Sequence, residues 1–189
     1  MKFFETIRIE DGRIHHLPYH QRRVDATLAA HYPHASIDLA GRITPPPDGL
    51  WRCRVVYDDE IDSVSYHPYT PRKVSSIRLI QADIDYPYKY CDRSAIDELF
   101  ARRGDADEIL IVKDGLLTDT SIANIALYLD GTWLTPAKPL LAGTTRARLI
   151  DEGALKTADL TPDDLKRAQK VALLNAMVGF LEVKLSIIS

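Results

Sequence analysis

The chain has 189 residues, enough for one hydrophobic core or for two small ones, and its 46% hydrophobic and 27% charged residues are typical of a globular protein. A formal net charge of −3, with basic residues scattered along the chain, gives no reason to expect nucleic acid or an anionic membrane as a partner. No apolar run is long enough for a membrane span, and none follows a basic start as in a signal peptide, so we expect a cytoplasmic protein. Cys53 and Cys91 match no metal-ligand spacing, so we expect free thiols and no metal.

The first part of the chain predicts a hairpin followed by a helix. Residues 3–9 alternate between apolar and polar side chains and are followed by Asp11-Gly12, a typical turn of a β-hairpin. Pro18 suits the first turn of a helix, which should run to about His31. The apolar runs and prolines that follow predict a short helix at residues 37–43 and strands at residues 50–57, 63–69 and 74–81.

Strands and short helices also fill the second half. Asp92 is a good N-cap for a helix that should run to Arg103 and end at Gly104. The other expected elements are strands at residues 108–112, 122–129 and 133–135, a helix at 145–152, a helix capped by Thr161 that ends near Arg167, and strands at 171–174 and 180–188. Because strands and helices are segregated rather than alternating, the predicted fold class is α+β, with a boundary near residues 83–86 between domains at 1–82 and 83–189.

Three features of the second half match what pyridoxal 5′-phosphate (PLP) requires of a protein. Lys89 supplies an amine that can form a Schiff base with the aldehyde, and Asp119 supplies a carboxylate that can keep the ring nitrogen protonated. Residues Gly143, Thr144 and Thr145 form a glycine-led turn at a predicted helix start, where backbone N–H groups can bind a phosphate. The combination predicts a PLP site.

The sequence resembles the fold-type IV PLP enzymes, which include branched-chain aminotransferases, D-amino-acid aminotransferases and 4-amino-4-deoxychorismate lyases. The resemblance begins with FETIRIEDGRIHHLPYHQRR at residues 4–23 and ends with NAMVGFLEV at residues 175–183. Its most specific blocks are Asp119, Asn124, Thr135-Pro136 and the segment LLAGTTR at residues 140–146. The resemblance implies a short version of the two-domain fold of the D-amino-acid aminotransferases, PLP as cofactor and a homodimer.

Lys89 is the predicted catalytic lysine. Most lysines are exposed surface residues, but the tyrosines and the proline around Lys89 predict a partly buried side chain with a lowered pKa and an available amine. The family carries its Schiff-base lysine at this position, often with Asn-Arg or Asp-Arg three and four residues later, which Asp92-Arg93 matches.

Two aspartates compete for the role of ring-nitrogen partner. Asp114 precedes Gly115 and reads as a turn residue. Asp119 follows a strand-like segment and stands where the family usually carries glutamate, so we predict that Asp119 pairs with the ring nitrogen. Its alternative is a carboxylate that merely ends a strand.

Further candidate phosphate ligands come from both ends of the chain. Arg23 and His20 match the family's H-x-x-R pattern, which implies a phosphate-binding Arg23 and an orienting His20; taken alone, Arg23 would be a solvated helix residue. Asn175 and Ala176 match a turn beside the phosphate in the lyase branch, although an asparagine there could simply satisfy a turn. The expected cofactor-binding set is Arg23, Lys89, Asp119, Gly143, Thr144, Thr145, Asn175 and Ala176.

Three functions fit this pattern. We favour a lyase that acts on 4-amino-4-deoxychorismate and forms 4-aminobenzoate and pyruvate, because of the compact size, Asp92-Arg93 and the Asn175 turn. A branched-chain or D-amino-acid aminotransferase would use the same residues. A binding protein that has lost catalysis is the third possibility. The presence of the lysine, the acid and the phosphate turn together argues against it. The expected partner is a small amino substrate.

Overall fold

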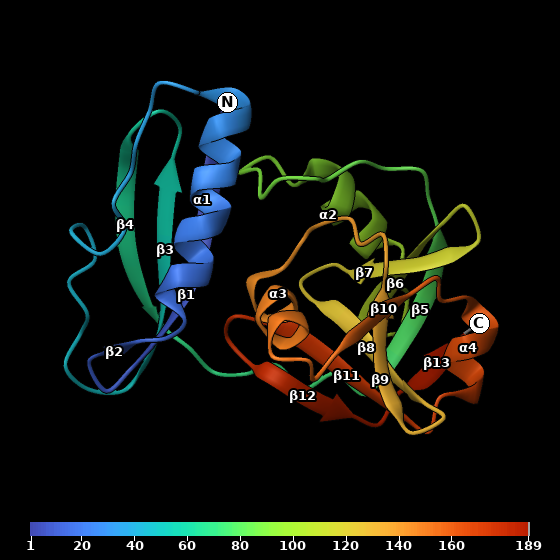
Figure 1. Ribbon diagram of the computed structural model, residues 1–189. Helices are drawn as coiled ribbons and strands as arrows, with labels where there is room; N and C mark the ends of the chain where they lie inside the picture. Colours follow the sequence, from blue (N-terminus) through green and yellow to red (C-terminus); the bar gives the residue numbers. More distant parts are fainter. Residues whose placement is uncertain (189) are drawn as a thin grey trace. The chain divides into compact units, whose positions relative to one another are not determined.

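The computed structural model describes residues 1–188, which form two compact units. The first unit comprises Met1–Pro71 together with Tyr88–Asp92, and the second comprises Arg72–Pro87 together with the chain from Arg93 onward (Figure 1). This division differs from the expected boundary between residues 82 and 83. The strand at residues 76–81 pairs with a strand of the second unit, whereas the short segment Tyr88–Asp92 returns to pair with the start of the chain.

The first unit is a four-stranded antiparallel sheet with one long helix. The sheet has the order β2-β1-β3-β4. Its elements are β1 (Phe3–Glu10), β2 (Arg13–Ile14), α1 (Leu17–His31), β3 (Leu50–Tyr57) and β4 (Ile61–Pro68). The core forms where Ile7 and Ile9 of β1 and Val55 of β3 pack with Val24 and Leu28 of α1. The predicted hairpin and helix are therefore confirmed.

The Tyr88–Asp92 segment lies along the start of β1. The Phe4 N–H donates to the Lys89 carbonyl at 2.9 Å, and the Cys91 N–H donates to the Lys2 carbonyl at 2.9 Å. The Phe3 and Tyr90 rings lie 5.3 Å apart, centroid to centroid. Backbone pairing and aromatic contact therefore tie this segment to the first unit.

The second unit is built on a nine-stranded mixed sheet among the described residues. Along one path the strand order is β10-β9-β8-β7-β6-β5-β13, and β11 branches off by pairing with both β8 and β12. The strands are β5 (Ser76–Gln81), β6 (Glu108–Lys113), β7 (Leu116–Thr120), β8 (Asn124–Leu129), β9 (Thr132–Pro136), β10 (Lys156–Ala158), β11 (Lys170–Asn175), β12 (Gly179–Val183) and β13 (Ser186–Ile188). Antiparallel pairs predominate, with parallel pairs at β5–β6, β5–β13 and β9–β10.

Three short helices pack on this sheet in the described part of the second unit. They are α2 (Ser94–Ala101), α3 (Thr144–Asp151) and α4 (Pro162–Arg167). Leu99 of α2 packs near Ile109, Leu149 of α3 near Ala172, and Leu165 of α4 near the core of β5–β8. Thr161 forms the expected capping box with Asp164 at the start of α4. No helix among residues 1–188 is both long and apolar enough to cross a membrane.

Several expected elements are wrong in detail. Residues 37–43 are not helical, because the Asp38 carboxylate accepts from the Ala40 and Gly41 N–H groups and closes a local turn instead. The N-cap of α2 is Arg93 rather than Asp92. The single closing strand expected at residues 180–188 is divided between β12 and β13, which pair with different neighbours.

Candidate active site

The predicted site residues fall into two groups, one in each unit. Lys89 and Arg23 belong to the first unit, and the carboxylate, the glycine turn and the asparagine turn belong to the second. Each group has hydrogen bonds of its own within its unit.

Lys89 is half-buried in the first unit, as its neighbouring tyrosines predicted. Its carbonyl accepts the hydrogen bond from Phe4, and its Nζ lies 4.6 Å from the centroid of the Phe4 ring. The backbone of Lys89 is therefore fixed by pairing with β1, while its amine lies against an aromatic face.

A buried carboxylate, Glu5, holds both residues of the H-x-x-R pattern. Arg23 donates to Glu5 through Nε and Nη2, at 2.8 and 2.6 Å, and His20 Nδ1 lies 2.6 Å from Glu5 Oε2. Glu5 and His20 are essentially inaccessible to solvent. Because His20 and Arg23 are three residues apart on α1, they share the helix face that meets β1.

The charges of this cluster follow from its burial. Burial alone would raise the pKa of Glu5, but the Arg23 guanidinium and the hydrogen bond with His20 outweigh it and lower that pKa to about 2. Burial lowers the pKa of His20, against the opposing effect of Glu5. At neutral pH the geometry therefore pairs an ionised Glu5 with a neutral His20 that donates its Nδ1–H.

Sequence reasoning did not single out Glu5, although its pattern contained a signal. Phe3, Ile7 and Ile9 all face the core, and Glu5 occupies the same phase of the strand. A carboxylate at an inward position requires a buried cation. The structure supplies that cation as Arg23, whose guanidinium is oriented by Glu5; phosphate binding by Arg23 stays a prediction.

In the second unit, Asp119 lies buried near the end of β7. Its Oδ1 accepts from Asn124 Nδ2 at 2.7 Å, and its Oδ2 accepts from the Leu141 N–H at 2.8 Å. Burial raises the pKa of Asp119 to about 6, against the opposing effects of these two donors and of the Arg146 charge. A carboxylate oxygen can accept more than one hydrogen bond, so a further cationic N–H donor can be accommodated chemically and would favour the ionised form.

The predicted phosphate turn lies at the start of α3. Gly143 is the N-cap of this helix, and no side chain caps the helix start. A Cβ on Gly143 would overlap Asn124 Oδ1, so any other residue there would displace the amide that bonds to Asp119 and Leu141. Thr144 and Thr145 are buried. The first N–H groups of a helix lack intrahelical acceptors, so this end of α3 suits a phosphate.

Asn175 closes the turn between β11 and β12. Its Oδ1 accepts from the Met177 and Val178 N–H groups, at 2.9 and 3.0 Å, and its Nδ2 lies 3.4 Å from the Ile122 carbonyl. The turn-forming role that the sequence left open is therefore observed. Ala176 lies in the same turn. Cofactor contacts by Asn175 and Ala176 stay predictions.

Three other polar residues of the second unit have structural roles. Asp114 lies in the turn between β6 and β7 with a φ of 51°, as expected of a turn residue. Arg146 is buried and donates to the Pro136 carbonyl at 2.9 Å. Asn124 also donates to the Leu141 carbonyl at 2.9 Å, which stabilises the segment that leads into Gly143.

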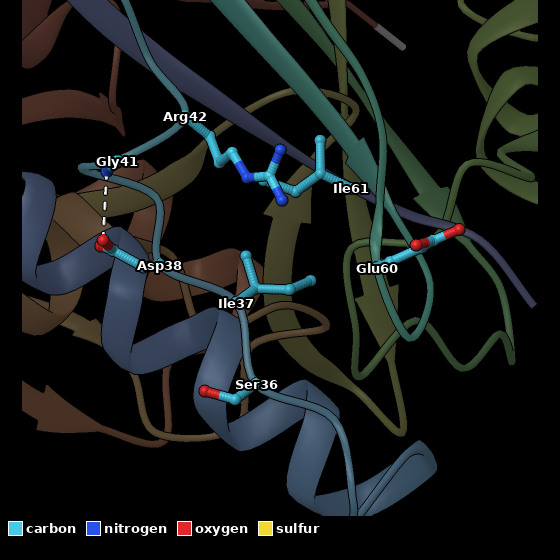
Figure 2. A pocket seen from close by; sticks show the side chains of 7 residues that line it. All are labelled: Ser36, Ile37, Asp38, Gly41, Arg42, Glu60 and Ile61. Carbon is cyan, nitrogen blue, oxygen red and sulfur yellow. Dashed lines mark hydrogen bonds between the residues drawn. The ribbon is translucent and has the colours of Figure 1, made fainter.

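A separate hollow of about 280 Å³ lies in the first unit, lined by the loop of residues 36–42 together with Glu60 and Ile61 (Figure 2). It contains none of the predicted site residues. Its Asp38 carboxylate is already used by the Gly41 N–H. Among residues 1–188 no cluster of three or more His, Cys, Asp or Glu side chains could hold a metal ion.

Comparison with known proteins identifies relatives over nearly the whole chain. The sequence model of the amino-transferase class IV family matches residues 86–185. An uncharacterized protein of Haemophilus influenzae is 36% identical over 183 residues, which are 93% of this chain and 97% of the relative.

Two solved structures are similar over nearly their full length. A candidate 4-amino-4-deoxychorismate lyase from Haemophilus somnus is 33% identical, with a TM-score of 0.87, over 94% of this chain and 97% of its own. A candidate amino-acid aminotransferase from Mesorhizobium loti is 26% identical, with a TM-score of 0.82, over 98% of this chain and 99% of its own. These two relatives are close to this chain in length. One is named as a lyase and the other as an aminotransferase.

Replacing Glu5 with glutamine should destabilise the protein in a pH-dependent way. The pKa of Glu5 is lower in the folded protein than in the unfolded chain, so its ionised form stabilises the fold above about pH 4.5, and this contribution is lost as the pH falls towards 2. Urea unfolding at neutral pH should give a free energy of unfolding lower by roughly 3 kcal/mol for Glu5→Gln, and the difference from wild type should shrink as the medium is acidified.

The matched control is Glu182→Gln, which removes an exposed ion pair with Lys170. It should change the free energy of unfolding by less than about 0.5 kcal/mol at any pH. A loss in Glu5→Gln that does not vary with pH would mean that the carboxylate stabilises the fold through packing and not through its charge.

Proposed function

Because this chain belongs to the amino-transferase class IV family, whose enzymes are PLP-dependent and share fold type IV, we propose that it is a PLP-dependent lyase that converts 4-amino-4-deoxychorismate into 4-aminobenzoate and pyruvate. The contacts of Asn124 carry the proposal. Its Nδ2 donates to Asp119, and its Oδ1 borders Gly143 at the uncapped start of α3. One side chain thus holds a buried carboxylate beside a helix start that suits an anion, and PLP requires a partner of each kind, for its ring nitrogen and its phosphate.

Each residue has a defined task in this proposal. When bound, PLP would supply an acceptor for the electron pair that remains when a bond at the substrate's amino-bearing carbon breaks. Lys89 would hold the cofactor through Nζ and would transfer protons to and from the substrate. Asp119 holds the proton on the ring nitrogen, and the N–H groups of Gly143, Thr144 and Thr145 bind the phosphate.

Other residues complete the binding of the phosphate. Arg23, oriented by Glu5, supplies a guanidinium, and Asn175 and Ala176 supply the turn between β11 and β12. The guanidinium matches phosphate geometry because its N–H groups can donate in parallel to two oxygens. We also propose an amino compound as substrate, a homodimer and a cytoplasmic location.

The lyase reaction is favoured by the Haemophilus somnus relative, which is more similar in sequence than the Mesorhizobium loti relative. Asp92-Arg93 and the Asn175 turn favour it as well. An aminotransferase acting on branched-chain or D-amino acids is the second candidate, favoured by the name of the Mesorhizobium loti protein. A non-catalytic binding protein is the weakest reading, because the lysine, the buried carboxylate and the uncapped helix start are all retained.

The lysine assignment is tested by chemical trapping. If Lys89 links to PLP, the purified protein supplied with PLP should absorb near ~420 nm, and borohydride should fix a pyridoxyl group on Lys89. Lys89→Ala should fold and lose the adduct. Lys113, which pairs with Asp83 and Asp85, is the matched control, and Lys113→Ala should keep the adduct. Mass spectrometry that finds the group on Lys113 or Lys138 would falsify the assignment.

The carboxylate is tested by an isosteric substitution. Asp119→Asn keeps the shape and removes the charge that holds the ring nitrogen protonated, so kcat should fall by ~10²-fold or more. Asp114→Asn, at an exposed turn in the same hairpin, should change kcat little. Equal kcat values for the two variants would remove Asp119 from the ring-nitrogen role.

The two reaction classes differ in what a single substrate does. A lyase releases pyruvate from 4-amino-4-deoxychorismate repeatedly with no acceptor, whereas an aminotransferase stops after one half-reaction until a 2-oxo acid arrives. We expect catalytic pyruvate release, and a visible absorption band that survives L-leucine, L-valine and D-alanine. Stoichiometric bleaching by one of these amino acids, reversed by 2-oxoglutarate, would assign the protein to the aminotransferases.

A further inference from the structure

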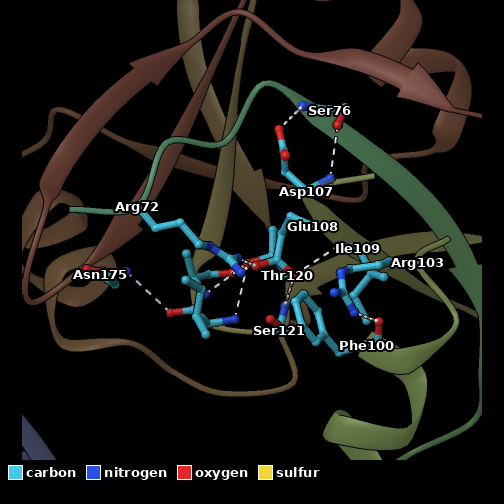
Figure 3. A network of polar contacts seen from close by, with 12 residues as sticks. Arg72, Ser76, Phe100, Arg103, Asp107, Glu108, Ile109, Thr120, Ser121 and Asn175 are labelled. Atoms are coloured by element: carbon cyan, nitrogen blue, oxygen red, sulfur yellow. Dashed lines mark hydrogen bonds and ion pairs between the residues drawn. The ribbon is translucent and has the colours of Figure 1, made fainter. Parts of the chain in front are cut away.

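A second buried carboxylate lies in the second unit, at the start of β6. Glu108 is inaccessible to solvent, and its Oε2 pairs with Arg72 Nη2 at 2.6 Å (Figure 3). Its Oε1 accepts from the N–H groups of Ile109 and Ser121, at 2.9 and 3.2 Å. A buried carboxylate is costly to desolvate, and here it contacts a residue that is distant in sequence.

Ser121 is held at both of its backbone polar groups by charged side chains. Its N–H donates to Glu108, and its carbonyl accepts from Arg93 Nη2 at 2.8 Å. Hydrogen bonds with one ionised partner are stronger than neutral ones. Ser121 is itself buried, so the two bonds are shielded from water.

The rest of this loop is also held tightly. Thr120 Oγ1 accepts from the Ala123 and Ile122 N–H groups, at 2.9 and 3.3 Å. The loop of residues 120–123 joins Asp119 to Asn124, and these two residues hydrogen-bond each other at 2.7 Å. Only Thr120 separates Ser121 from Asp119, so the position of Ser121 constrains the backbone that carries the Asp119 carboxylate.

We propose that Glu108 and Arg93 are positioning residues that clamp Ser121 and thereby fix the direction of the Asp119 carboxylate. Arg72 neutralises Glu108 so that a charged acceptor can remain buried. The clamp rests on the proposed function of Asp119 as partner of the ring nitrogen. If Glu108 only stabilised the start of β6, its hydrogen bond with the Ile109 N–H would be enough. The bond to the distant Ser121 N–H would then have no task.

Two double variants separate the acceptor from the buried charge. Arg72→Met with Glu108→Met removes the charge pair and the acceptor for Ser121, while Arg72→Met with Glu108→Gln removes the charges and keeps an acceptor oxygen. Neither leaves an unpaired buried charge, so both should fold. Arg103→Met is the further control. The guanidinium carbons of Arg72 and Arg103 both lie over the Phe100 ring, at 5.4 and 4.2 Å from its centroid, but only Arg72 pairs with Glu108.

The first measurement is amide hydrogen exchange of residues 120–123 in protein freed of PLP. Exchange should be at least about tenfold faster in the double methionine variant than in the methionine–glutamine variant, and strand β8 should be unchanged in both. Arg93→Met should also accelerate exchange in the loop, and it provides the same test if the double methionine variant does not fold. Equal protection in all variants would overturn the clamp.

The second measurement is steady-state kinetics with PLP and the substrate identified by pyruvate release. The double methionine variant should lose at least about tenfold in kcat relative to the methionine–glutamine variant, with KM within about threefold. Faster loop exchange with an unchanged kcat would show that Glu108 holds the loop without positioning Asp119, and would overturn the inference. The exchange measurement needs no cofactor, so failure of the clamp and failure of the proposed function are distinguishable.

Discussion

The side-chain amide of Asn124 is the contact on which the second unit's part of the site depends. It bonds to the Asp119 carboxylate and to the Leu141 carbonyl, and its oxygen lies where a Cβ at position 143 would stand. An amide in this place can donate to two acceptors at once, which a carboxylate could not do. The direction of the acid and the backbone path into α3 are thus set by one residue. Asp119 is one methylene shorter than glutamate, and its bonds to Asn124 and Leu141 fix where its carboxylate lies.

Glu5 and Asp119 are both buried carboxylates, but their surroundings stabilise them differently. Glu5 is paired bidentately with Arg23 and remains strongly acidic, whereas Asp119 accepts from neutral donors and its pKa is raised to about 6. A further cation would stabilise an already neutralised carboxylate only slightly. It would stabilise the ionised form of a buried carboxylate that has no paired cation much more. The difference fits a structural task for Glu5 and a cofactor-directed task for Asp119.

The sequence predicted the elements whose signals are local. The alternation in β1, the proline at the start of α1 and the capping box of α4 each depend on neighbouring residues, and the structure has all three. The helix predicted after α1, at residues 37–43, is wrong because the Asp38 side chain accepts from the N–H groups of its neighbours. Periodicity does not reveal that competition.

The site was only partly predictable for a related reason. Asp119 and Gly143 belong to compact motifs, so the pattern identified them as candidates. Glu5 and Glu108 have partners that are distant in the chain, and no spacing rule relates Glu108 to Ser121. The domain boundary differs from the expected one because β5 pairs with β6 and because Tyr88–Asp92 returns to pair with β1, and only the folded chain reveals these pairings.

That return has a consequence for how the chain can be divided. The polypeptide passes from one unit to the other at residues 71–72, 87–88 and 92–93, so neither unit is a continuous piece of sequence. A fragment that stops at Pro71 would lack the partner of Lys2 and Phe4, and one that starts at Arg72 would carry Tyr88–Asp92 without the strand they pair with. Recombination at any single junction therefore cannot transfer either unit intact. A gene fusion that reused only the chain from Arg72 onward would keep Lys89 and lose strand β1, with which the backbone of Lys89 pairs.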